Sequence, residues 1–144
     1  MCNGHSTRVS QGGSIAVLRP TLQKADSETE IRVLFSNSPP TSVDQIGTQV
    51  QFHGLDPSDT LSSNEHRLVI HRDGNLETSN TQSLSSIDPF FSFTLGDRHD
   101  SVVNLSRRLE LGVGEKGIIG RRISMLAGSR KGERVVAEGI IGWN

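Results

Sequence analysis

The residues best arranged for chemistry form a glycine motif, G-x-G-x-x-G, that runs from Gly112 to Gly117. In dinucleotide sites such glycines follow a strand and open a helix whose N-terminus binds a pyrophosphate, while a later acid holds the ribose. The segment Ile118–Leu126 could supply the helix, and Glu138 the acid. Gly120 inside that segment costs roughly 1 kcal/mol relative to Ala in a helix. The alternative, a glycine-rich hairpin, is therefore favoured, and we predict no cofactor.

Other reactive side chains form weaker patterns. His71-Arg72-Asp73 resembles the catalytic tripeptide of protein kinases, but Thr78 occupies the position of that motif's metal-binding Asn. The five histidines contain no i, i+2 or i, i+4 pair that would suit a metal, and Cys2 is the only cysteine. A cysteine-based zinc cluster and an internal disulfide are therefore excluded. We predict no metal site and no catalytic residue.

The net charge of −1 hides two blocks of opposite sign. The segment 56–100 holds eight acids and three bases, a net of −5, and the segment 105–134 holds eight bases and three acids, a net of +5. These blocks could attract each other within one fold, drive head-to-tail self-association, or offer the basic segment to a polyanion. The predicted basic patch consists of Arg107, Arg108, Arg121, Arg122, Arg130 and Lys131.

Composition limits the classes of protein that fit. Apolar residues make up 33% of the chain, with no Tyr, one Trp and five Phe, so an aromatic base-stacking platform is disfavoured. The low apolar share suits long polar loops, or a subunit that completes its burial against neighbours. The segment Met1–Gly13 lacks a signal-peptide pattern, and no apolar run approaches the ~20 residues that cross a bilayer. We expect a cytoplasmic protein, or a virion component if the protein is viral, with no membrane association.

Short apolar runs with period-two alternation, separated by Gly, Pro, Ser and Asn, predict a mainly β fold: an antiparallel half-barrel or sandwich with at most one short helix. We expect a polar N-terminal arm with two strands over 1–46 and a β-rich domain over 47–144, together one compact unit. The segment Val102–Leu111 fits a helix or a strand equally well. The predicted strands are Ser14–Leu18, Glu30–Phe35, Gln49–His53, Arg67–His71, a strand with Phe91, Phe93 and Leu95 on one face, and Arg134–Ile141.

From Gly47 onward the chain resembles the FKBP-type peptidyl-prolyl isomerases over about 70 residues. Short landmarks keep the order and near-constant spacing of that family. They are Gly47-Thr48-Gln49-Val50, Leu68-Val69-Ile70-His71, Gly74-Asn75-Leu76-Glu77, Phe91-Ser92-Phe93-Thr94-Leu95-Gly96 and Leu111-Gly112-Val113-Gly114-Glu115-Lys116. The resemblance implies an FKBP-like half-barrel.

The departures from that family fall on its proline pocket. Arg72 stands in place of a Tyr and Asn104 in place of the pocket-floor Trp, and the family's Phe-Asp pair is replaced by polar residues near Gln82 and Ser83. The isomerase acts through an aromatic pocket that excludes water, so loss of these aromatic residues should remove catalysis. The resemblance therefore implies a half-barrel that binds without catalysis. The ligand pocket that it implies is lined by Phe91, Phe93, Val103 and Ile70.

A second resemblance covers the same stretch. The segments 46–52, 79–82, 89–96 and 100–102 are similar to the C-terminal domain of Gre transcript-cleavage factors and to the nucleoside diphosphate kinase regulator. Those domains share the FKBP-like topology and bind RNA polymerase. Two resemblances that agree on one topology support the fold and leave the function open.

We therefore expect a non-catalytic protein-binding or assembly module, with a protein partner or self-association and a possible polyanion contact through the basic segment. One alternative is a self-assembling structural subunit of a viral capsid or tail, built as a β-sandwich. Another is a weak peptidyl-prolyl isomerase.

Overall fold

The computed structural model describes residues 13–20, 30–37, 47–54, 66–74, 89–95, 102–127 and 134–144. These ranges contain strands and no helix, so the expected mainly β fold class is confirmed. It follows that no described segment is a long apolar helix of the kind that crosses a membrane. The strands are β1 (Ser14–Pro20), β2 (Ile31–Asn37), β3 (Thr48–His53), β4 (His66–His71), β5 (Pro89–Leu95), β6 (Val102–Asn104), β7 (Arg122–Ala127) and β8 (Arg134–Trp143).

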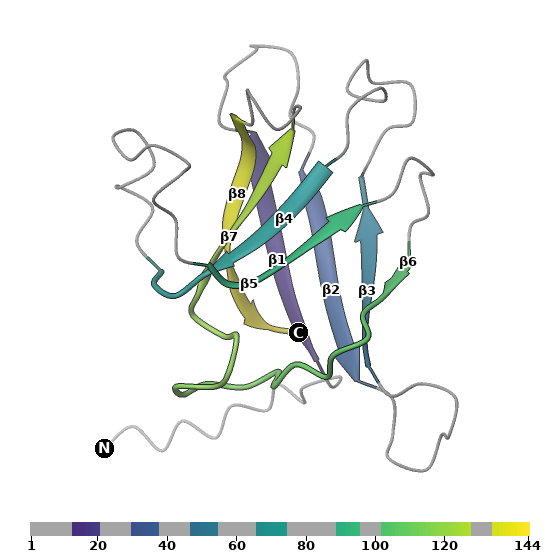
Figure 1. Cartoon of the computed structure of the whole chain (residues 1–144). Coiled ribbons are helices and arrows are strands. Elements are labelled where there is room, and N and C mark those ends of the chain that lie inside the picture. Colours follow the sequence, from purple (N-terminus) through teal and green to yellow (C-terminus); the bar gives the residue numbers. More distant parts are fainter. Residues whose placement is uncertain are drawn as a thin grey trace.

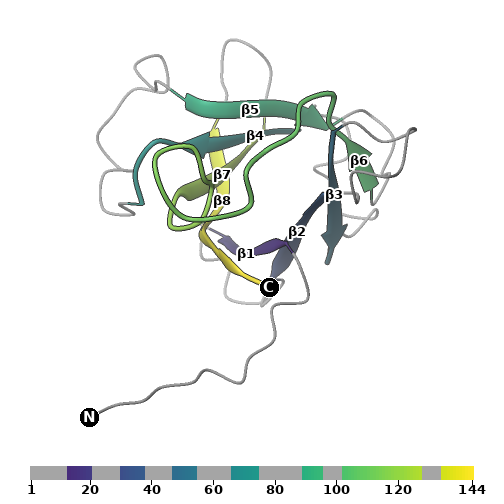
Figure 2. The same ribbon diagram turned by 90° about the horizontal axis from the view of Figure 1, so that it is seen from below.

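All eight described strands belong to one antiparallel sheet in the order β5-β4-β7-β8-β1-β2-β3-β6. The sheet curls into a nearly closed barrel, which is seen end-on in Figure 2 and from the side in Figure 1. β1 pairs with both β2 and β8, so the two strands predicted within 1–46 lie inside the sheet. The barrel stays open between β5 and β6, which are the first and last strands of the sheet.

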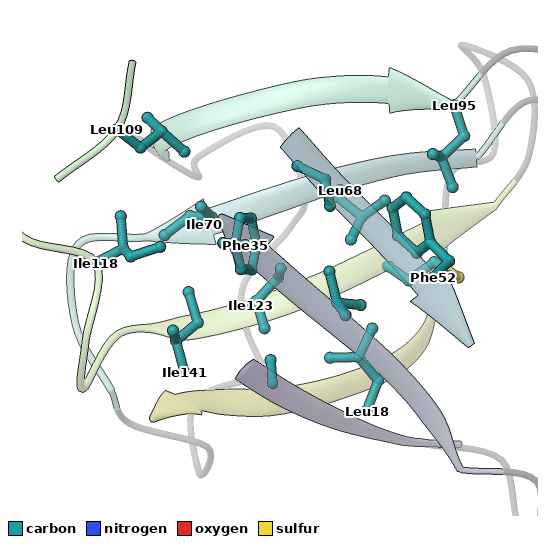
Figure 3. Packing of buried hydrophobic residues seen from close by; sticks show 14 of the residues in the cluster. Leu18, Phe35, Phe52, Leu68, Ile70, Leu95, Leu109, Ile118, Ile123 and Ile141 are labelled. Atoms are coloured by element: carbon teal, nitrogen blue, oxygen red, sulfur yellow. The ribbon is translucent and has the colours of Figure 1, made fainter. Parts of the chain in front are cut away.

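Alternation of side chains along the strands builds the core. Ala16 and Leu18 of β1 and Val33 and Phe35 of β2 point inward and are almost fully buried, while the residues between them are more exposed. Figure 3 shows such side chains from facing strands meeting in the interior. Full burial of one large aliphatic or aromatic side chain stabilises the fold by about 1.5–3 kcal/mol.

The segment that could have been helical, Ile118–Leu126, contains most of strand β7. β7 lies between β4 and β8 near the middle of the sheet, and all six of its residues are buried. A strand that is buried on both faces loses the apolar–polar alternation that identifies a strand in a sequence. The ambiguous segment Val102–Leu111 begins as strand β6 and continues without helix.

The glycine motif forms a compact loop. A parallel bridge between Glu110 and Gly117 closes it, and Gly114 has a φ of 111°, a conformation that favours glycine. A Cβ added at Gly117 would lie 2.0 Å from the Gly112 carbonyl oxygen. Because a strand follows the motif, no helix N-terminus faces the loop, and the dinucleotide interpretation is wrong. The expected hairpin is also absent, since the bridge within this described loop is parallel.

Thr48 fixes the segment that follows β6 against the start of β3. Its Oγ1 donates a hydrogen bond to Asn37 Oδ1 (2.6 Å) and accepts one from the Leu109 N–H (2.8 Å), while the Leu105 N–H donates to the Thr48 carbonyl (2.9 Å). Leu105 and Leu109 are buried in the core. In Figure 3, Leu109 lies near the beginning of the strand that ends at Leu95. This segment therefore fills part of the barrel that the sheet leaves open.

Candidate functional site

The four residues of the predicted ligand pocket belong to the hydrophobic core or pack against it. Ile70 is fully buried, and Phe91, Phe93 and Val103 are half-buried and pack against the same core. The two phenylalanines point inward from β5, and their ring centroids lie 6.1 Å apart. The structure thus shows the four residues as part of the hydrophobic packing, and a ligand pocket among them stays a prediction.

The described members of the predicted basic patch differ in their exposure. Arg107 and Arg108 are exposed, Arg121 is half-buried, and Arg122 is buried at 7% exposure. The remaining two, Arg130 and Lys131, lie outside the described residues. A polyanion-binding surface therefore stays a prediction, with Arg107 and Arg108 as its exposed described members.

Arg121 holds three parts of the chain together. Its guanidinium donates to the carbonyl oxygens of Gly117 (Nε, 2.7 Å), Arg72 (Nη1, 2.6 Å) and Glu115 (Nη2, 2.6 Å). The same group stacks on the Phe90 ring, 3.9 Å from its centroid. A planar guanidinium with several fixed donors can make these contacts together, whereas an ammonium group cannot. The role of Arg121 is therefore to fasten the glycine loop to β5 and to the end of β4.

A buried polar cluster occupies the outer face of the sheet, opposite the core, where β4, β7 and β8 lie side by side. It consists of His71, Arg122 and Ser124, and the register places Glu138 directly opposite Ser124. His71 Nε2 lies 2.9 Å from Ser124 Oγ, and His71 Nδ1 lies 3.3 Å from Arg122 Nη2. The imidazole therefore joins β4 to two positions of β7.

The hydrogen-bonding rules fix the tautomer of His71. A guanidinium only donates, so Nδ1 must be the acceptor that faces Arg122. Nε2 then carries the proton and donates to Ser124 Oγ. Burial and the neighbouring Arg122 lower the pKa of His71 from 6.5 to about 4, against a smaller raising effect of Asp73. The imidazole is thus neutral near pH 7, in agreement with this tautomer.

This arrangement is opposite to that of a serine nucleophile. A general base must accept the serine proton on an unprotonated nitrogen, whereas His71 presents a protonated one to Ser124. Within the described part of the chain, Arg122 Nε and Nη1 and one oxygen of Glu138 are buried without a hydrogen-bond partner. The described residues also contain no group of three or more metal ligands. The cluster fits a structural role better than a catalytic one.

The candidate interaction site is the outer edge of β5. β5 is a terminal strand, and no described strand pairs along its second edge. The sequence of this strand, Pro-Phe-Phe-Ser-Phe-Thr-Leu, carries no charge, and its three phenylalanines are half-buried. Proteins usually protect such edges with charged side chains, bulges or proline, and a flat uncharged edge promotes pairing. Here Pro89, at the start of β5, and a bulge in the β4–β5 pairing interrupt the edge, and the guanidinium of Arg107, from the segment after β6, lies 5.8 Å from the Phe91 ring centroid.

The sequence predicted that Phe91 and Phe93 share one strand face, but it did not predict that β5 lies at the edge of the sheet. The local residue pattern of a strand does not show which strands become its neighbours. The sequence also did not predict the pairing of His71 with Ser124, which are separated by 53 positions in the chain. Comparison of the sequence with protein-family models and with curated proteins finds no match to either.

Proposed function

We propose that this protein is a non-catalytic protein-binding or assembly module, and that it binds an extended segment along the outer edge of β5. The observation that carries the proposal is the open sheet, which ends in a seven-residue uncharged strand. Addition of a strand to such an edge supplies main-chain hydrogen bonds, and the side chains of alternate residues supply specificity.

Two features of the structure support binding over catalysis. Phe91 and Phe93, the aromatics that the FKBP resemblance retains, pack against the core, so they do not line an empty cradle for a prolyl peptide. In the pairing of Ser124 with His71, the imidazole has its proton on the wrong nitrogen for activation of the hydroxyl as a nucleophile. An FKBP-like half-barrel that binds without catalysis is compatible with the packing of the two phenylalanines and with the tautomer of His71.

The proposal is tested by selection of a random 12-residue peptide library displayed on phage against the purified protein. Thr94→Glu places a carboxylate on the β5 edge, where exposed Thr94 stands opposite Arg67 of β4. The matched control is Ser36→Glu, an exposed position on the interior strand β2. We expect peptides with alternating apolar residues that bind the wild type and the control and bind Thr94→Glu at least tenfold more weakly. Selection that yields no peptide sensitive to Thr94→Glu contradicts the proposal.

A further inference from the structure

We draw no further inference here: the strongest candidate, the buried polar cluster around Arg122 on the outer face of β4, β7 and β8, belongs to the candidate site already described, and its unpartnered atoms on Arg122 and Glu138 carry no proposal because nothing in the structure shows what they bind.

Discussion

Ser124 Oγ accepts the Nε2–H of His71 at 2.9 Å, and this bond joins β7 to β4 on the face of the sheet opposite the core. Ser124→Ala leaves the buried Nε2–H without its acceptor, which costs about 1–3 kcal/mol of folding free energy. The measurement is urea unfolding monitored by circular dichroism. Ser36→Ala, an exposed position on β2, is the control and should change stability by less than ~0.5 kcal/mol. Equal stability of the two variants would show that the bond does not form.

His71 should make stability depend on pH. Its pKa is lowered in the folded protein to about 4, so between pH 6.5 and 4 the unfolded chain takes up a proton that the folded chain does not. Stability is therefore lost as the pH falls through this window, and His71 contributes no further loss below it. The shift corresponds to at most about 3 kcal/mol.

The measurement is the free energy of unfolding at several pH values for the wild type and for His71→Gln, which removes the titration and keeps an N–H donor. The difference between the two proteins cancels the contributions of other groups. We expect the variant to lose less stability than the wild type between pH 6.5 and 4. Parallel pH profiles would contradict a buried, neutral His71.

Arg121→Lys should loosen the glycine loop. The substitution keeps the charge but cannot reproduce the three carbonyl contacts and the stacking on Phe90, so we expect a loss of about 1–3 kcal/mol. Amide hydrogen exchange at Gly117 and Ile118 should accelerate in the same variant. Arg32→Lys, an exposed position on β2, is the matched control and should behave as the wild type does. A faster exchange in both variants would argue against a specific role for Arg121.

Two glycines of the same motif should respond differently to alanine. An added Cβ at Gly112 meets nothing within 4 Å, so Gly112→Ala should change stability by less than ~0.5 kcal/mol. At Gly117 the same Cβ would lie 2.0 Å from the Gly112 carbonyl oxygen, so the loop must shift and stability should fall by about 1–3 kcal/mol. Thermal unfolding compares them. A dinucleotide motif would instead require both glycines for ligand binding, with little effect on folding.

The sequence determined which segments of this protein form most of its strands. In β1, β2 and β3 one face of each strand is buried and the other is more exposed, so alternation marks them clearly. Each observed bound lies within two residues of the predicted one. Local pattern could do this because a strand's side chains alternate between its two faces regardless of which strand it pairs with.

Only the tertiary structure decided the rest. β7 escaped recognition because both of its faces are buried. The loop of the glycine motif is held by the side chain of Arg121, which also bonds the carbonyl of Arg72 after β4. The pairing of His71 with Ser124 depends on which strands become neighbours, as does the position of β5 at an open edge. Strand order is set by long-range packing of the barrel core, in which residues far apart in sequence bury one another, and no local pattern of residues encodes it.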